Sequence, residues 1–333
     1  MYYYVKAGLH LFYKKIAVKG LESIPKKEAI LFVANHQNAM MDPILIATHN
    51  TRILYFLARA SAFKNKIAAK LLNAIHAIAI YRVRDGVNSK ELNKKVFQQC
   101  VALLSQKKTL LIFPEGSHSV KRQIRSLRSG FSQISYDFLS AYPEHQLYIV
   151  PVGLNFTDTI AYPEKVAIHY GNKIDVNALF DENYRKFTGK LITVVSSNLK
   201  ELTVHVPDEN YPQIIDKLPK EAFLTPKITN KKIANNSLLT TSATAKLKTK
   251  KRNIFYYLMM VNTLTAFLFW RWLKPKIKEK EFISTAKFSI GLTLFPIVYL
   301  IKSSIIYAIF DLKSSVLYLI SSILIVFLST KTN

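Results

Sequence analysis

Three long apolar stretches lie together near one end of the sequence, and they constrain the fold more than any other feature. They cover residues 254–273, 288–310 and 314–328. A helix needs about 20 predominantly apolar residues to cross the hydrocarbon core of a bilayer, and the first two stretches meet this requirement. The third is shorter, and either spans a thinned membrane or forms a re-entrant or interfacial helix. We therefore predict two or three transmembrane helices over residues 254–329, with the core of a soluble domain as the alternative.

The chain is strongly basic, and its basic residues cluster beside these apolar stretches. It carries 47 Lys and Arg against 21 Asp and Glu, a net charge of +26, which indicates a polyanionic partner. Cations next to apolar segments favour anionic membrane lipids over nucleic acid. Residues 221–253 are rich in Lys, Asn, Ser and Thr, a composition that predicts a flexible basic linker. By the positive-inside rule, the linker and the domain before it should face the cytoplasm.

Residues 1–20 mix tyrosines and aliphatic side chains with lysines, and no cleavable signal peptide is evident. This mixture predicts a helix in the membrane interface, or an amphipathic helix docked on the domain.

The single cysteine, Cys100, excludes an intramolecular disulfide and a cysteine-rich zinc site, and its apolar surroundings predict a buried thiol. The histidines lack the spacing of metal ligands, so no metal is expected.

Residues 21–220 alternate short apolar runs with longer helical patterns. The apolar runs predict strands over residues 29–34, 53–57, 75–81, 109–113, 148–154 and 166–170. The helical patterns between them cover residues 64–73, 89–105 and 128–139. Strands alternating with helices predict an α/β domain with a mixed, largely parallel sheet flanked by helices. Ligands of such sheets gather at the loops beyond the strand carboxyl ends.

A histidine and an aspartate follow the first of these strands, in Asn35-His36 and Asp42-Pro43. Histidine can accept a proton from a hydroxyl and return it, and a nearby aspartate can fix its tautomer. On a continuous helix the two side chains would point about 240° apart, so the pair requires a loop, with Asp42 at the start of the next helix. The alternative is that Asp42 only caps that helix, with Pro43 in its first turn.

The segment Phe113-Pro114-Glu115-Gly116-Ser117-His118 follows a later strand. Proline ends the strand, glycine permits close backbone approach, and Glu115 places a carboxylate at the sheet edge. A basic run comes next, with Lys121, Arg122, Arg125 and Arg128. Arginine can bind phosphate oxygens through two hydrogen bonds, so the run suits a phosphate-bearing substrate. The alternative is a solvated basic face.

Two further segments each place one residue of interest at a strand. Arg82 comes directly after an apolar strand, where ligands bind in α/β sheets. Pro151 lies inside another predicted strand, which indicates an edge strand or a bulge.

In their order along the chain, these four segments resemble the motifs of the glycerolipid acyltransferase family, which includes lysophosphatidate and glycerol-3-phosphate acyltransferases. The similarity covers roughly residues 20–175, and it is most specific where Asn-His and Asp-Pro precede Phe-Pro-Glu-Gly by about 80 residues. It implies an α/β acyltransferase domain, a donor that is acyl-CoA or acyl-carrier protein, and a glycerol-backbone acceptor. No cofactor is implied beyond these co-substrates.

The resemblance also implies roles for individual residues. His36 would be the general base and Asp42 the partner that orients it. The acceptor site would contain Arg82, Glu115, Gly116, Ser117, Arg125 and Arg128. Structural positions of the motifs would be Asn35, Pro43, Pro114 and Pro151.

The sequence departs from the usual family pattern at two places. Five residues separate His36 from Asp42 where four are usual, and Ser117-His118 stands where Thr-Arg is usual. These features are similar to a branch that includes eukaryotic glycerol-3-phosphate and dihydroxyacetone-phosphate acyltransferases. We expect phospholipid biosynthesis with 1-acylglycerol-3-phosphate or glycerol-3-phosphate as acceptor. The alternatives are another lysophospholipid or aminolipid acceptor, or an inactive lipid-binding scaffold.

Overall fold

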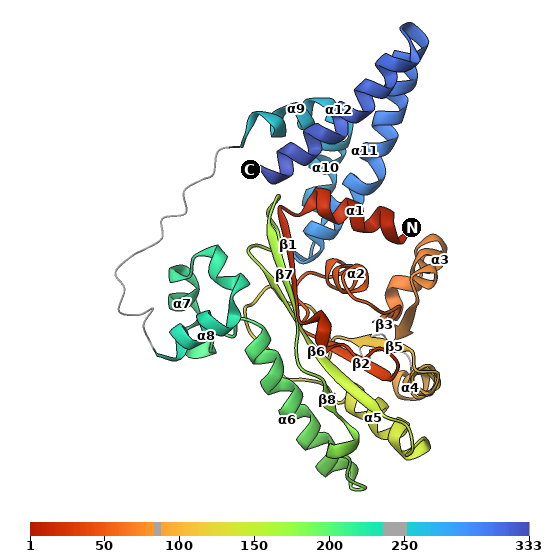
Figure 1. Cartoon of the computed structure of the whole chain (residues 1–333), viewed down its shortest axis with the longest axis vertical. Helices are drawn as coiled ribbons and strands as arrows, with labels where there is room; N and C mark the ends of the chain where they lie inside the picture. Colours follow the sequence, from red (N-terminus) through yellow and green to blue (C-terminus); the bar gives the residue numbers. More distant parts are fainter. Residues whose placement is uncertain (83–87, 236–251, 333) are drawn as a thin grey trace.

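The computed structural model describes residues 1–82, 88–235 and 252–332 (Figure 1). The described residues form an eight-stranded sheet in the order β1-β7-β6-β2-β5-β3-β4, with β8 paired to β6. The strands are β1 (Lys15–Lys19), β2 (Ala29–Ala34), β3 (Leu54–Arg59), β4 (Ala77–Ile80), β5 (Thr109–Ile112), β6 (Leu147–Phe156), β7 (Lys165–Tyr170) and β8 (Ile174–Asp175). Strand β6 runs antiparallel to β7 and β8, whereas the other pairs are parallel. The predicted mixed, largely parallel sheet is confirmed.

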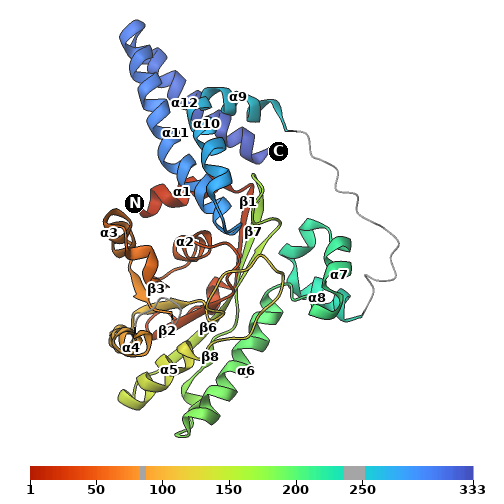
Figure 2. The ribbon, with the colours of Figure 1, turned by 180° about the vertical axis from the view of Figure 1, so that it is seen from behind.

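Helices cover both faces of the sheet (Figure 2). One face packs against α1 (Tyr2–Phe12), α2 (Met41–Thr48) and α3 (Lys66–Ala74), and the other against α4 (Ser89–Ser105), α5 (Gly130–Ala141) and α6 (Tyr184–Leu202). Successive residues of the central strand β2 alternate between the two cores, with Phe32 on the first and Leu31 and Val33 on the second. All six of its residues are buried, as expected for a strand covered on both faces.

The N-terminal segment is only partly the helix that its composition predicts. Helix α1 docks on the domain through the buried side chains of Leu9 and Phe12, which is one of the two alternatives. Residues 15–19 are not helical, because they pair with β7 as the edge strand β1. The α/β domain therefore begins at Lys15, before the predicted boundary at residue 21.

A small helical cluster follows α6 and corrects the predicted linker. Residues 221–235 are not an unstructured linker, because they form η6 (Lys220–Leu224) and α8 (Pro226–Ala234) beside α7 (Tyr211–Lys217). Their apolar side chains, including Phe223 and Ile233, share a separate small core. The rest of the predicted linker, residues 236–251, lies outside the described residues.

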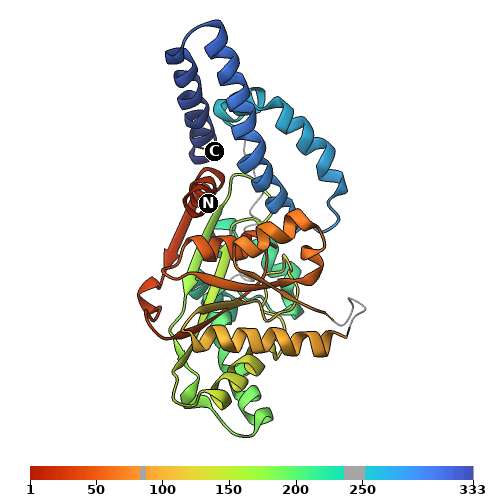
Figure 3. The same cartoon turned by 90° about the vertical axis from the view of Figure 1, so that its right-hand side faces the viewer.

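The C-terminal region holds α9 (Ile254–Asn262), α10 (Leu264–Leu273), α11 (Phe282–Ile309) and α12 (Leu312–Lys331). Helices α11 and α12 are long and apolar enough to cross a membrane, by length and composition alone. They stand at one end of the molecule beside α1 (Figure 3). These two helices are consistent with the predicted membrane region and suggest membrane association.

The predicted single span over residues 254–273 is wrong, because the helix breaks at Thr263 into α9 and α10. Asn262 at the break donates to Ser322 of α12 at 2.9 Å, and its backbone oxygen accepts from Lys302 of α11 at 2.7 Å. Helix α9 thus packs along α12 away from the domain. Helix α10 then packs along α11 back toward the domain and brings Trp270 beside Lys287. The Lys302 ammonium group satisfies a carbonyl that the break releases from helical bonding.

Both ends of the α11–α12 hairpin are fixed to the α/β domain. At the start of α11, Ser284 donates to the Thr159 carbonyl at 2.6 Å. At the end of α12, Thr330 donates to the Leu11 carbonyl at 2.6 Å and Lys331 to the Tyr13 carbonyl at 2.8 Å. The start of α11 and the end of α12 therefore form the end of the hairpin that contacts the domain, and the turn between the two helices forms the opposite end.

Candidate active site

The candidate site lies where the adjacent parallel strands β2 and β5 end. The loop after β2 carries His36, and the loop after β5 carries Glu115. These loops are joined directly, because the Ser119 N–H donates to the His36 carbonyl at 2.9 Å. The candidate site thus lies at the carboxyl edge of the sheet, as the strand pattern predicts.

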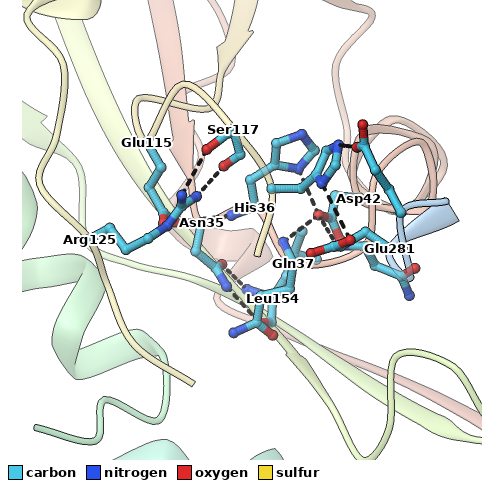
Figure 4. A network of polar contacts seen from close by, with 12 residues as sticks. Asn35, His36, Gln37, Asp42, Glu115, Ser117, Arg125, Leu154 and Glu281 are labelled. Carbon is cyan, nitrogen blue, oxygen red and sulfur yellow. Dashed lines mark hydrogen bonds and ion pairs between the residues drawn. The ribbon is translucent and has the colours of Figure 1, made fainter. Parts of the chain in front are cut away.

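His36 and Asp42 form a close pair (Figure 4). Nδ1 of His36 lies 2.9 Å from Oδ2 of Asp42. The same oxygen accepts the backbone N–H groups of Gln37 at 2.8 Å and Asn38 at 2.7 Å. The Asp42 side chain is fully buried, whereas 16% of the His36 side chain is exposed. Asp42 therefore fixes the ring and the loop around it, leaving Nε2 of His36 as the nitrogen available for proton transfer.

The alternative, that Asp42 only caps the helix, does not fit its contacts. Helix α2 begins at Met41 and has no side-chain cap, and Asp42 accepts hydrogen bonds from the loop before the helix. Pro43 lies in the first turn of α2, where its missing N–H costs no helical bond. The extra residue between His36 and Asp42 is accommodated in this loop, where Ala39 adopts a positive φ of 41°.

Glu115 connects the histidine loop to the basic run. Its Oε1 accepts the His36 backbone N–H at 3.2 Å, and its Oε2 accepts Nε of Arg125 at 2.6 Å. Arg125 also donates to Oγ and the carbonyl oxygen of Ser117. Burial raises the pKa of the Glu115 carboxyl, an effect that the Arg125 charge opposes. Figure 4 shows these side chains beside His36.

Aromatic packing holds the histidine ring from the strand side. The rings of Phe113 and His36 are stacked, with centroids 4.2 Å apart and planes at 21°. This stacking restricts rotation of the imidazole about its side-chain bonds. The Phe-Pro-Glu-Gly segment therefore supports His36 through its phenylalanine as well as its glutamate.

The predicted structural positions of the motifs frame this arrangement. Asn35 exchanges two hydrogen bonds with the backbone of Leu154 in β6, at 3.0 and 2.7 Å, and so anchors the end of β2. The Pro114 carbonyl accepts the Arg128 N–H at 2.7 Å. Pro151 lies in the interior strand β6, so the predicted edge position is wrong. Its missing N–H is tolerated because the neighbour of β6 changes there from β8 to β7.

The arginines of the predicted acceptor site differ in their surroundings. Arg128 is exposed, and within the described residues its guanidinium has no hydrogen bond or ion pair. It lies beside Gly116, whose positive φ of 71° suits glycine, and a Cβ at Gly116 would be 3.4 Å from Cγ of Arg128. Arg82 follows β4, at the far end of this side of the sheet. Its place at the acceptor site remains a prediction.

Arg122, a member of the basic run predicted to suit a phosphate-bearing substrate, is buried in a structural role. It donates to Oε1 of Gln37 at 2.9 Å, and its guanidinium lies 4.4 Å from the Phe223 ring centroid. Burial lowers its pKa to about 10. Arg122 therefore ties the histidine loop to the small helical cluster, which leaves Arg128 as the exposed arginine of this run.

His118 brings the C-terminal region into the site, which the sequence does not predict. Its ring lies edge-on to His36, with centroids 5.5 Å apart, and edge-on to Phe282 at 5.2 Å. Its Nε2 is 3.1 Å from Glu279, and its Nδ1 is 3.9 Å from Glu281. Burial and the neighbouring His36 lower the pKa of His118, against the two carboxylates. The segment between α10 and α11 thus covers one side of the His36–Asp42 pair.

The comparisons with known proteins agree with this site. Residues 15–155 match the family model described as Acyltransferase. Over 141 residues, the chain is 28% identical to the "Probable 1-acyl-sn-glycerol-3-phosphate acyltransferase" of Mycoplasma pneumoniae. That alignment covers 40% of this chain and 50% of the relative, so the chain spans about half the length of the curated relative that it matches. The α/β domain, from β1 to β6, is therefore similar to the Acyltransferase family over the matched residues.

One solved structure is also similar. The 1-acyl-sn-glycerophosphate (LPA) acyltransferase PlsC from Thermotoga maritima superposes with a TM-score of 0.42 at 20% identity. The superposition covers 56% of this chain and 72% of that chain.

Proposed function

We propose that this protein is a membrane-bound O-acyltransferase of phospholipid biosynthesis. It would move a fatty acyl group from acyl-CoA or acyl-carrier protein to 1-acylglycerol-3-phosphate or glycerol-3-phosphate. The observation that carries the proposal is the 2.9 Å contact between His36 and Asp42, next to an exposed arginine on the neighbouring loop. The Mycoplasma relative, named as a probable 1-acyl-sn-glycerol-3-phosphate acyltransferase, supports this class of acceptor.

The proposed reaction is direct acyl transfer between two substrates. Nε2 of His36 removes the proton of the acceptor hydroxyl while its oxygen attacks the thioester carbonyl. The buried Asp42 carboxylate stabilises the imidazolium that forms. The tetrahedral intermediate collapses with cleavage of the carbon–sulfur bond, and the imidazolium returns its proton to the thiolate. The single cysteine is buried in α4, which argues against a cysteine acyl-enzyme.

The acceptor phosphate would bind at the basic run after the Pro-Glu-Gly turn. Arg125 is held by Glu115 and Ser117, so its charge is largely committed to the loop. Arg128 is exposed beside Gly116, and its guanidinium can approach a phosphate without breaking an internal bond. We therefore assign the main phosphate contact to Arg128 and a positioning role to Arg125.

The position of the site relative to the membrane fits a lipid acceptor. Glu279 and Phe282, at the base of α11, contact His118 at the site. A lysophospholipid could then present its glycerol end to His36 while its acyl chain stays in the bilayer. Lysines 274, 276, 278 and 280 precede α11 on this same side, and by the positive-inside rule they support a cytoplasmic position for the catalytic domain.

The direct test offers the purified full-length protein both donors and several acceptors in lipid vesicles. Glycerol-3-phosphate, lysophosphatidate and lysophosphatidylcholine are each supplied with labelled acyl-CoA or acyl-carrier protein, and the products are identified by mass spectrometry. We expect lysophosphatidate or phosphatidate as product. Transfer only to lysophosphatidylcholine would contradict the proposed acceptor class, and no transfer to any acceptor would favour the inactive scaffold.

A further inference from the structure

A large cavity lies between α1 and the C-terminal helices, apart from the catalytic pair. Its volume is about 580 Å³, within the range of about 300–1,000 Å³ for small-molecule sites. Helix α1 closes one side, and α9, α10, α11 and α12 form the others. Neither His36 nor Asp42 is among the lining residues. Its occupant therefore need not be a reacting substrate.

The walls of this cavity are almost entirely apolar. Leu11, Met260, Phe267 and Phe295 line it from different helices. Gly291 of α11 lies in the wall, and a Cβ built there meets nothing within 4 Å, so the space beside it is open. Protein interiors are close-packed and rarely keep voids larger than a water molecule, so hydrocarbon should fill this space. The acyl chains of the surrounding membrane are the available hydrocarbon.

Two cations mark the domain-facing end of the cavity. Lys287 and Arg252 are lining residues, and no acidic side chain is among the described residues that line it. Lys287 donates to the Ile160 carbonyl at 2.6 Å, which uses one of its three N–H groups. The carboxylates of the adjoining loop, Asp158 and Glu164, are engaged by Lys220 at 2.7 and 3.7 Å. Arg252 donates to the Tyr162 carbonyl and lies 4.7 Å from the Tyr256 ring centroid, but neither partner is an anion. The positive charge at this end is therefore available to an anionic headgroup.

We propose that this cavity holds one anionic phospholipid of the surrounding membrane. Its acyl hydrocarbon lies between α1 and the C-terminal helices, and its phosphate contacts Lys287 and Arg252. The bound lipid fills the space between the docked N-terminal helix and the membrane hairpin. It thereby holds the hairpin against the domain at the point where the hairpin reaches the active site. Binding here does not require His36, so it is independent of acyl transfer.

The hydrocarbon part is tested by filling the cavity from Gly291. The variant Gly291→Leu places a side chain into the open space, and leucine favours the helix more than glycine does. The matched control is Gly189→Leu on α6, where a Cβ also meets nothing within 4 Å, far from the cavity in sequence and outside its lining. Native mass spectrometry then counts lipids on full-length protein taken from vesicles with equal phosphatidylglycerol and phosphatidylcholine.

We expect the wild type and Gly189→Leu to keep one phosphatidylglycerol, and Gly291→Leu to lose it. Circular dichroism and thermal unfolding establish that both variants fold. Equal lipid retention by Gly291→Leu and the control would overturn the proposal. Retention of added lysophosphatidate in place of phosphatidylglycerol would also overturn it, because the cavity would then belong to the acceptor.

The headgroup part is tested by removing the Lys287 charge. Lys287→Gln should lower the preference for phosphatidylglycerol over phosphatidylcholine by about fivefold, since one cation near a membrane surface contributes about 1 kcal/mol. Lys313→Gln, at the opposite end of the hairpin, is the control and should keep the wild-type preference. An unchanged preference in Lys287→Gln would overturn the assignment of the phosphate to this end.

Discussion

His36 and Asp42 are joined by a 2.9 Å contact in which the aspartate oxygen also accepts two backbone N–H groups. One buried carboxylate thus orients the imidazole and shapes the loop that carries it. The loop explains how the pair meets despite one more intervening residue than is usual in the family. Because Nδ1 faces Asp42, Nε2 is the nitrogen that would transfer the proton in the proposed reaction.

Replacing Asp42 with asparagine should separate catalysis from folding. The asparagine side chain keeps an oxygen for the loop N–H groups, but it cannot stabilise the imidazolium or hold the required tautomer. We expect kcat to fall by about 10³- to 10⁴-fold while the protein still folds. Steady-state kinetics with Asp208→Asn, an exposed aspartate, as control would test this. Near wild-type turnover by a folded Asp42→Asn protein would argue against the pair.

Removing the Arg128 charge should affect the acceptor rather than the donor. In Arg128→Gln, the charge-assisted bond to the acceptor phosphate is lost, so the acceptor KM should rise about tenfold or more. The donor KM should change little. Arg185→Gln, an exposed arginine of α6 outside this run, is the matched control. An equal rise in both KM values for Arg128→Gln would contradict the assignment.

Because the chain turns back between α9 and α10, two positions are predicted to lie on opposite sides of the membrane. With Cys100→Ala as background, single cysteines are placed at Lys276, between α10 and α11, and at Lys313, at the turn between α11 and α12. In intact cells, an impermeant thiol reagent outside should label Lys313→Cys and leave Lys276→Cys unlabelled. If residues 254–273 formed one span instead, Lys276→Cys would lie across the membrane from the domain and would be labelled.

His49 should make the fold sensitive to acid. It packs beside His10 and contacts Thr48 and the Leu45 carbonyl. Burial lowers its pKa from 6.5 to about 4, and the nearby charges of His10 and Lys6 act in the same direction. In the unfolded chain His49 binds a proton near pH 6.5. In the folded chain it binds that proton only near pH 4. Stability should therefore fall as the pH drops through this window, by at most about 3 kcal/mol.

The measurement is thermal unfolding in detergent from pH 7.5 to pH 4.5, for the wild type and His49→Gln. The variant should lose less stability over this range than the wild type, because glutamine does not titrate. Parallel pH profiles would show that His49 does not supply this acid sensitivity.

The central strands and the loops of the candidate site were predictable from the sequence, because their signals are local. Residues 29–34 form a continuous apolar run, and His36 and Glu115 follow two such runs that lie side by side. Helix α6 was not predicted, although its buried residues recur at every fourth position in Phe187, Leu191, Val195 and Leu199. That spacing was a readable helical signal.

Other features depend on contacts between distant residues. Residues 15–19 carry lysines at both ends and become a strand only by pairing with β7. The break at Asn262-Thr263 depends on Lys302 and Ser322, which lie in later helices. Glu279 reaches His118 only because the hairpin docks on the domain. No local pattern identifies these partners, since each interaction joins segments far apart in the sequence.

The central claim is that His36 is the general base of an acyl transfer. Purified His36→Ala and His145→Gln, a surface histidine as matched control, are compared with the wild type in vesicles with labelled donor and lysophosphatidate. Labelled phosphatidate should form at the same rate in the wild type and the control, and at least about 10²-fold more slowly in His36→Ala. Undiminished phosphatidate formation by a folded His36→Ala protein would contradict the claim.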